Sequence, residues 1–561
     1  MQKTARKSER MKKKKHIQFT VKQLSYVLIA LYLVCLVPLF VIAKYDFPSS
    51  DDFSMALEAH LAWEETNSVV AAIAAGFSKA VKLYFTWTGY FTSSLLTTVS
   101  PATFGIQWYG FGAILVLVVL HISVIFFLHV LLQTVLHLDK YISRCAVIGV
   151  LFLMIQMMPQ GEARVEAFYW YSGAGNYTLT FSLMLIYLSC LLLSIYGKTK
   201  KARNIALVFS CLSGFFTGGG NYMSALTAAI LTAVLGMFLI MIRTGKMRTL
   251  LEEENPSYKK YSNEQDSYLI REKEKHVFLC GEWKWTLIIP MVFLFVGFFI
   301  NCLAPGNVVR SEQTGGFGAI KSILISLYYT LDYTLDDWLN WAVILIFAVL
   351  AILFWNGMPS CRNDFTFQHP VIIFLLSYGV VSANVTPLVF AIGGLGAGRN
   401  QALFWMQFVL ILMLFEWYLT GWFWRKTKGR EQSNMSSDQI EESMACSLPK
   451  ARDLGEESCR VLTFILVLWM GGSVMCIKVD PHYYSCTSAT YDLVSGTARA
   501  YEEENERRLV ILEDDSIEDA VLEQHEAKPS LLFYSDISVD EGGWDNFTMK
   551  YYFGKNSISS E

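Results

Sequence analysis

The stretch Leu24–Ala43 reads LSYVLIALYLVCLVPLFVIA and carries no charged side chain over 20 residues. A helix of this length extends about 30 Å and matches the hydrocarbon core of a bilayer. Nine Lys or Arg residues precede it within residues 1–22, and no small-residue cleavage site follows it. The stretch is therefore predicted to be an uncleaved first membrane span, preceded by a basic cytoplasmic N-terminus at residues 1–23.

Further apolar runs recur along the 561-residue chain, which is 53% hydrophobic and only 17% charged. A soluble domain carries about a quarter charged residues, so this composition excludes an ordinary soluble protein. The runs predict an all-α polytopic membrane protein with about 11 transmembrane helices and a transmembrane domain over 24–478. The ten runs after the first lie near 107–136, 145–159, 176–197, 204–217, 222–242, 285–303, 338–355, 370–392, 401–423 and 461–478.

Lys and Arg are distributed unequally between the predicted loops. With the N-terminus inside, the inner segments hold 32 of the 46 basic residues, whereas the outer segments before the C-terminal tail hold 7. Cytoplasmic loops are enriched in Lys and Arg. The chain is therefore predicted to lie in the cell membrane with its N-terminus cytoplasmic and its C-terminus outside. Outer loops are predicted at 44–105, 160–175, 304–337 and 393–400.

Residues 479–561 contain no run long enough to span a bilayer, and they hold 18 acidic residues against 6 basic ones. Ala498–Arg508 has a helical pattern, and 508–512 and 530–534 are predicted to be short buried strands. A small, acidic, extracytoplasmic α/β C-terminal domain is the resulting prediction.

Most of the eleven Cys residues fall inside predicted spans or on the cytoplasmic side, where they are expected to be apolar fillers. Cys486 lies in the predicted outer domain. Its pairing with Cys476 or Cys302 stays open.

Two adjacent carboxylates, Asp51 and Asp52, follow Pro48 in the first outer loop. They could stabilise the start of a helix that begins at Phe53. Alternatively, one of them is a general base that takes a proton from an acceptor hydroxyl at the membrane surface. Trp87 lies downstream in an aromatic segment, where it is either an interfacial anchor or a platform for a lipid chain or a sugar ring.

The segment QGEARVEAFYWYSGAGNYT, from Gln160, places Glu162 and Glu166 one helical turn apart around Arg164. Its Gly-rich end reaches Asn176, and a similar GGGNYMS stretch contains Asn221. Glycine there predicts either a close approach of the backbone to another group or a tight turn. All five residues are candidate substrate ligands, with the two glutamates as reserve acids or partners of sugar hydroxyls.

Two arginines follow turn-forming outer segments. Arg310 ends the segment NCLAPGNVVR, in which Pro305 and Gly306 are predicted to form a turn and Asn307 to cap. Arg399 and Asn400 belong to GGLGAGRNQ, at the outer start of the tenth span. A guanidinium can pair with lipid headgroups or hold a phosphate with two hydrogen bonds. A phosphate or pyrophosphate site is predicted at Arg310 and Arg399, with Asn307 and Asn400 beside them.

No cofactor is predicted. His60 and His482 are isolated and the chain has no HExxH motif, which leaves a divalent ion between the first-loop carboxylates and a phosphate as a weak alternative. The sequence has neither a Gly-rich loop in a βαβ context nor a cytosolic Asp-x-Asp module, so nothing indicates a nucleotide-sugar donor. Nucleic acid is not an expected partner, because topology and anionic lipid account for the basic N-terminus.

These features together resemble the GT-C-type membrane glycosyltransferases in the basic start, the Asp pair of the first outer loop, the aromatic segments after it and the outer C-terminal module. More closely, the chain is similar to a family of uncharacterised bacterial multi-pass proteins. One departure is Tyr90, where that family has Arg after Trp-x-Gly, so no phosphate role is assigned there. The segments that carry the resemblance are Trp87–Phe91, Ala304–Arg310, Gly396–Asn400 and Trp544–Asn546, with Tyr551 and Tyr552.

The resemblance implies a glycosyltransferase that moves a sugar from a polyprenyl-phosphate donor to an envelope glycan, lipid or polymer on the outer face. Asp51 or Asp52 would activate the acceptor, and Arg310 and Arg399 would balance charge on the leaving lipid phosphate. Two rivals stay open: a transporter or flippase of a lipid-linked glycan, and a non-enzymatic envelope assembly protein.

A transport path favours ionisable residues at mid-membrane. The main polar residues inside the predicted spans are His121 and His129. Each is interpreted as a hydrogen-bonded core residue.

Overall fold

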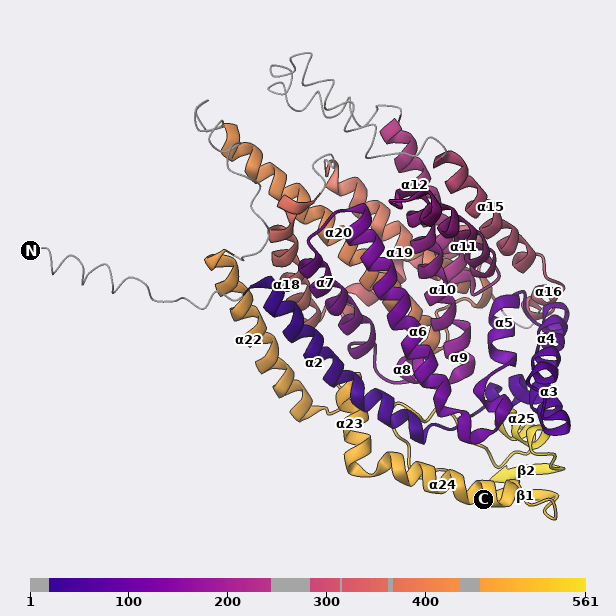
Figure 1. Cartoon of the computed structure of the whole chain (residues 1–561). Helices are drawn as coiled ribbons and strands as arrows, with labels where there is room; N and C mark the ends of the chain where they lie inside the picture. The colour runs from indigo at the N-terminus through magenta and orange to yellow at the C-terminus, as the bar shows by residue number, and fades with distance from the viewer. Residues whose placement is uncertain (1–19, 244–282, 313–314, 362–366, 434–454, 561) are drawn as a thin grey trace, which may run out of the picture.

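The structure is a computed structural model that describes residues 20–243, 283–312, 315–361, 367–433 and 455–560 (Figure 1). Within these ranges it is almost entirely helical, and one parallel pair of short strands lies near the C-terminus. The helices at the eleven predicted apolar runs are α2 (Val21–Ile42), α6 (Gly110–His129), α7 (Lys140–Leu151), α10 (Thr178–Tyr196), α11 (Lys200–Gly218), α12 (Tyr222–Arg243), α15 (Trp283–Cys302), α18 (Trp341–Gly357), α19 (Pro370–Ile392), α20 (Gly398–Ser433) and α22 (Glu456–Val479).

Further helices lie between these. They are α3 (Asp51–Thr66), α4 (Val69–Thr86), α5 (Phe91–Thr98), α8 (Glu162–Arg164), α9 (Tyr171–Asn176), α16 (Pro305–Ser311) and α17 (Ala319–Asp332). Several helices also contain or continue into π-helical turns, at Val130–Val135, Phe152–Gln156, Val165–Tyr169 and Tyr333–Trp338.

Ten helices in the described ranges are long and apolar enough to cross a membrane. Nine of them coincide with predicted spans, which supports a multi-pass membrane protein. The prediction of eleven is corrected at three places. The runs at 145–159 and 204–217 are not among the ten, whereas Val69–Thr86, which was placed in an outer loop, is.

Local sequence explains these differences. Helix α7 is short, and α11 begins with Lys200, Lys201 and Arg203, which lowers its hydropathy. Both nevertheless pack against the other helices: α11 contacts α10 and α15, and α7 contacts α2 and α18. Helix α4 is apolar but turns its small residues Ala72, Gly76 and Ala80 inward, so its large apolar side chains are exposed.

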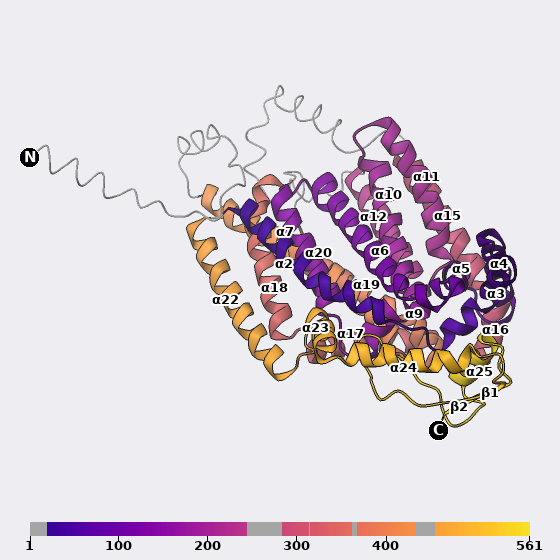
Figure 2. The same ribbon diagram turned by 60° about the horizontal axis from the view of Figure 1, so that its bottom comes forward.

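The bundle is built around α10. The segment Tyr171–Tyr196 is 83% buried within the protein, whereas Glu457–Val479, which contains α22, is 11% buried and lies at the edge (Figure 2). His121 follows the prediction of a hydrogen-bonded core residue, since its ring nitrogens contact the Tyr32 hydroxyl at 2.8 Å and the Leu117 carbonyl at 2.6 Å.

The C-terminal region forms a module of α23 (Ser485–Ser495), α24 (Thr497–Leu512), β1 (Asp519–Leu522), α25 (Trp544–Tyr552) and β2 (Ser557–Ser560). Helix α24 contains the predicted Ala498–Arg508 helix but also 508–512, which was predicted to be a strand. Segment 530–534, the other predicted strand, has no regular secondary structure. The two strands of the structure are instead β1 and β2. Each misassigned segment is buried at only two positions, Arg508 and Leu512 in one and Leu531 and Leu532 in the other, and a short apolar run does not distinguish a strand from other structure.

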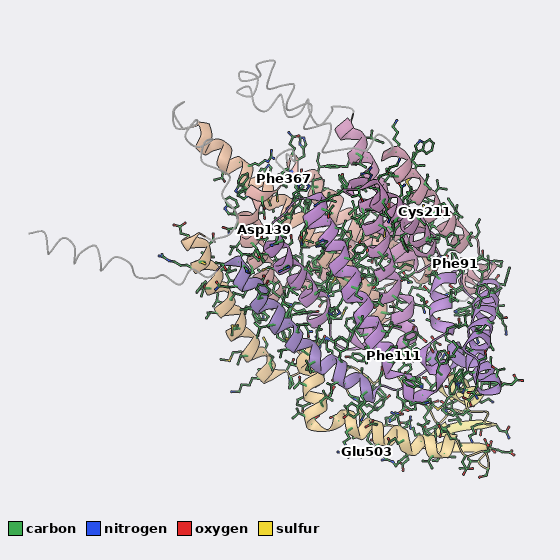
Figure 3. All side chains as sticks on the ribbon, viewed as in Figure 1. Phe91, Phe111, Asp139, Cys211, Phe367 and Glu503 are labelled. Carbon is green, nitrogen blue, oxygen red and sulfur yellow. The ribbon has the colours of Figure 1, made fainter. Side chains whose placement is uncertain are left out.

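The loops segregate to opposite ends of the bundle. Segments predicted to be inside contact one another, as in the 3.1 Å hydrogen bond from the Asp139 amide to Ser360. Segments predicted to be outside meet at the other end, where α24 crosses beneath the bundle. Figure 3 shows Asp139 and Phe367 near one end and Glu503 of α24 at the other. We call the second end the module end; the compartment that it faces stays a prediction.

Candidate functional site

Asp52 lies at the start of α3 and has no exposed surface. One carboxylate oxygen accepts hydrogen bonds from the Ser172 amide at 2.8 Å and hydroxyl at 2.6 Å. The other accepts from the Tyr109 hydroxyl at 2.5 Å and the Ser49 amide at 3.3 Å. Burial raises the pKa of Asp52 to about 6, although the Ser172 and Tyr109 hydrogen bonds favour the charged form. Asp52 therefore joins the first predicted outer loop to the second.

A second carboxyl group, Asp46, is buried close to Asp52. Burial raises the pKa of Asp46 well above its usual range, and the negative charge of Asp52 adds to the effect. One Asp46 oxygen accepts from the Phe47 amide, whereas the other is buried and has no hydrogen-bond partner among the described residues. Asp46 was not predicted to have a role, because nothing in its local sequence distinguishes it from a residue that merely ends a span.

Asp51 is partly exposed and faces the C-terminal module. Its Oδ1 accepts a 2.7 Å hydrogen bond from the indole N–H of Trp544, the first residue of α25. Asp545 lies next to Trp544 and accepts a 2.6 Å hydrogen bond from the Ser535 hydroxyl. Burial raises the pKa of Asp545, and the Asp51 charge also contributes. The module thus brings a second carboxyl group to Asp51.

Arg399 and Glu166 form an ion pair at the same end. The Arg399 backbone amide and its Nη1 both donate to Glu166 Oε2, at 3.0 and 2.9 Å. Glu166 is 1% exposed and the Arg399 side chain 25% exposed, so the arginine alone keeps an accessible face.

Aromatic rings surround the Arg399 guanidinium. Its carbon lies 5.1 Å from the Trp170 ring centroid and 5.8 Å from that of Tyr177. Tyr534 of the module stacks on Trp170 at 4.0 Å and is hydrogen-bonded to Arg399. Burial and the Glu166 charge raise the pKa of Tyr534 to about 12, which keeps its hydroxyl protonated. The arginine is therefore held in an aromatic frame that includes a residue of the module.

Arg310 belongs to a second group of residues. Its guanidinium carbon lies 5.5 Å from the ring centroid of Trp87, which is 39% exposed. Asn307 accepts from the Gly89 amide at 2.9 Å and donates to the Tyr222 hydroxyl at 2.8 Å. Pro305 begins α16 instead of forming a turn, and Asn307 bridges two segments instead of capping, so both local predictions are corrected.

Tyrosines connect the two arginine groups. The Tyr90 and Tyr222 rings lie 4.8 Å apart, edge to face. Burial and neighbouring Tyr177 raise the pKa of Tyr90, while the positive charge of Arg310 lowers it. Tyr177 in turn borders Arg399. Tyr90 is thus close enough to Arg310 and to Tyr177, which borders Arg399, to interact electrostatically with both.

Other predicted ligands make structural contacts. Arg164 is 3% exposed and donates to the carbonyls of Met158, His482 and Tyr483, so it fastens the module to the bundle. Burial lowers its pKa to about 10. Glu162 is exposed at the start of α8 and is not part of the Arg399 pair.

The three remaining asparagines also bond to nearby backbone. Asn176 donates to the Ser172 carbonyl and Asn400 to the Leu395 carbonyl, both over short sequence distances. Asn221 accepts from the Met223 amide. Asn221 Nδ2 and Asn400 Oδ1 are buried without a hydrogen-bond partner in the described part of the chain.

The Gly-rich segments are explained by close packing. A Cβ on Gly219 would lie 2.0 Å from the Phe91 ring, and one on Gly218 would lie 2.3 Å from the Leu294 carbonyl oxygen of α15. A Cβ on Gly173 would likewise meet the Glu166 carbonyl oxygen at 2.6 Å. Of the two predicted explanations, close approach is correct at these positions, and the approaching groups belong to the protein itself.

No family model, curated protein or solved structure matches this chain. The resemblance to membrane glycosyltransferases therefore stays a prediction. In the described ranges, no group of three or more His, Cys, Asp or Glu side chains is arranged to hold a metal ion.

Proposed function

We propose that this protein is a membrane glycosyltransferase that moves a sugar from a polyprenyl phosphate to an envelope glycan, lipid or polymer at the module end. The observation that carries the proposal is the convergence of Asp51, Glu166 and Arg399 with the stacked Trp170 and Tyr534. Sugar transfer requires a base for the acceptor hydroxyl, a cation for the departing phosphate and apolar faces for the sugar ring. In the proposal Asp51 is the base, Arg310 the cation and the half-buried Tyr534 the apolar face, because Trp170 beneath Tyr534 is only 3% exposed.

Asp51 is the better candidate for the general base. Its carboxylate is partly exposed, whereas both oxygens of Asp52 are saturated with hydrogen bonds and sealed from solvent. In this proposal Asp52 positions Asp51 by fixing the first turn of α3. The acceptor hydroxyl gives its proton to Asp51 as its oxygen attacks the anomeric carbon, and the bond to the lipid phosphate breaks with inversion.

The two arginines have different roles in the proposal. Arg399 already neutralises Glu166, so its exposed face offers hydrogen bonds more than net charge. Arg310 carries its charge over the exposed face of Trp87, beside the apolar helix α4. A lipid phosphate approaching along the bilayer would meet Arg310 first, with its chain against α4 and its sugar directed toward Arg399.

The test uses purified protein in nanodiscs with a short-chain polyprenyl phosphate that carries a radiolabelled hexose. Asp51→Asn is expected to reduce transfer at least 100-fold, because general-base catalysis contributes about 10²–10⁴. Glu541→Gln, an exposed carboxylate of the module, is the matched control and should retain wild-type activity. Full activity of Asp51→Asn, or no product with the wild-type protein, would contradict the proposal.

A transporter is the second candidate, because the bundle contains buried polar groups that the sequence analysis missed. Thr227 donates to Gln407 at 2.7 Å, and Asn384 approaches Thr227 at 3.5 Å. Gln407 Nε2, Asn384 Oδ1 and Glu416 Oε2 are buried without hydrogen-bond partners among the described residues. Intramembrane polar residues often mark transport paths. Movement of labelled lipid between leaflets without transfer would favour this function.

A further inference from the structure

Cys35 and Cys486 come from segments 451 positions apart and meet where the C-terminal module packs on the first span. Cys35 lies in α2, and Cys486 is the second residue of α23. Helices α2 and α23 pack side by side, both cysteines are free thiols, and their side chains are close enough to interact electrostatically. Cys476 and Cys302 were the predicted partners for Cys486, because no local sequence pattern relates Cys486 to Cys35.

The backbone holds both cysteines in place. The Cys486 amide donates to the Gln156 side chain at 2.9 Å, and the neighbouring Ser485 hydroxyl donates to the Ile155 carbonyl at 2.7 Å. Cys35 is fixed within the regular helix α2, and α2 and α23 pack side by side. A disulfide requires Cα atoms about 4.4–6.8 Å apart and side chains that face each other. Two packed helices whose thiols are close enough to interact approach this geometry.

We propose that Cys35 and Cys486 form a disulfide that fastens the C-terminal module to the first membrane span. The oxidant is a disulfide of the thiol-oxidoreductase class in the compartment that the module faces. The thiolate of one cysteine attacks a sulfur of that disulfide, and the second cysteine then displaces the oxidoreductase. Two thiols lose two electrons and two protons, and the oxidoreductase leaves as a dithiol.

The bond secures the part of the chain that completes the module end. Trp544 and Tyr534, which contact Asp51 and Trp170, both lie C-terminal to Cys486. Helix α22, which leads into the module, lies at the edge of the bundle and buries few of its residues. A covalent link to α2 restrains the module. This inference is independent of the proposed glycosyltransferase activity.

The first experiment counts thiols in the full-length protein. Membranes are denatured in excess N-ethylmaleimide, so that buried free thiols are blocked as well, and the protein is then reduced and labelled with PEG-maleimide. The wild type is expected to gain two PEG groups. Cys35→Ala and Cys486→Ala should each gain none, whereas the matched controls Cys476→Ala and Cys302→Ala should still gain two. A wild-type protein that gains none, or a gain that persists in Cys486→Ala, overturns the proposal.

A second experiment does not depend on the folding of cysteine variants. A protease site is introduced between α20 and α22, so that Cys35 and Cys486 fall on different fragments after cleavage. The fragments are expected to migrate together without reductant and separately with it, and mass spectrometry should identify the Cys35–Cys486 peptide pair. Fragments that separate without reductant, or a linked peptide pair containing another cysteine instead, overturn the proposal.

Discussion

Asp46 and Asp52 place two carboxyl groups in one buried region beneath the module, which makes their protonation part of the folding equilibrium. Asp52 has a folded-state pKa of about 6, above its ordinary value of 3.8. A raised pKa means that the fold favours the protonated form. This contribution to stability is complete below about pH 4 and is lost as the pH rises through about 6.

The first prediction concerns that pH dependence. A difference of about two pH units corresponds to about 3 kcal/mol. The wild-type midpoint of thermal unfolding in detergent is expected to fall between pH 4 and pH 6. Asp52→Asn should flatten this slope, because the amide stays neutral and its oxygen can still accept from Ser172. An identical slope in wild type and variant would show that Asp52 does not titrate in this range.

The second prediction concerns the Arg399–Glu166 ion pair. Arg399→Gln leaves Glu166 buried without its cation and should cost about 2–3 kcal/mol, less than the roughly 3–5 kcal/mol of a fully buried pair, because Arg399 is partly exposed. Glu166→Gln in the Arg399→Gln background should recover part of that loss. Chemical unfolding of the two single variants and the double variant measures the coupling, and additive losses would contradict it.

At the scale of elements, α16 packs closely against the end of α4 because Gly306 of α16 has no side chain. A Cβ on Gly306 would lie 2.6 Å from the backbone nitrogens of Trp87 and Thr88, which cannot move independently of α4. The same contact places Arg310 over Trp87, so Gly306 affects the geometry of the partly buried arginine.

The third prediction follows from this contact. Gly306→Ala gains up to about 1 kcal/mol in helix propensity, but the steric overlap is expected to exceed that gain and destabilise the protein by about 1–2 kcal/mol net. Gly315→Ala is the matched control, since a Cβ there meets nothing within 4 Å. Equal unfolding midpoints for the two variants would indicate that α16 and α4 separate easily.

At the scale of the whole molecule, the module is docked by polar contacts to the bundle backbone as well as by apolar packing. Arg164 of the bundle, which is buried, also donates to two carbonyls at the start of the C-terminal region, those of His482 and Tyr483. The module residues Tyr484, Tyr501 and Leu531 belong to the same hydrophobic core as the bundle. The module therefore shares buried apolar contacts with the bundle, and the predicted C-terminal domain over 479–561 stays a prediction.

The fourth prediction tests this docking. Arg164→Gln removes charge-assisted hydrogen bonds from buried carbonyl oxygens and should cost about 3 kcal/mol. If the module detaches and redocks faster than the protease cleaves it, a loss of about 3 kcal/mol corresponds to about 100-fold faster proteolysis of the module. Arg499→Gln removes only an exposed ion pair with Glu503 and should leave the rate unchanged. Equal cleavage rates in the two variants would mean that Arg164 does not hold the module.

The candidate site was partly visible in the sequence. Asp51, Glu166 and Arg399 were found because charged residues are rare in a membrane protein and stand out in outer loops. Tyr534 was missed because it lies in an apolar run that was predicted to be a strand. Trp544 belongs to a noted Trp-x-Asn segment, but no local pattern indicated that its indole would contact Asp51.

The sequence by itself determined the multi-pass helical architecture and the separation of the loops into two groups. Both depend on runs of side chains whose transfer into lipid is a local property. Only the tertiary structure decided that Asp52 is sealed while Asp51 is not, that Arg399 pairs with Glu166, and that Cys35 faces Cys486. Each of these depends on which distant segments pack together, and packing is decided by the fit of whole surfaces.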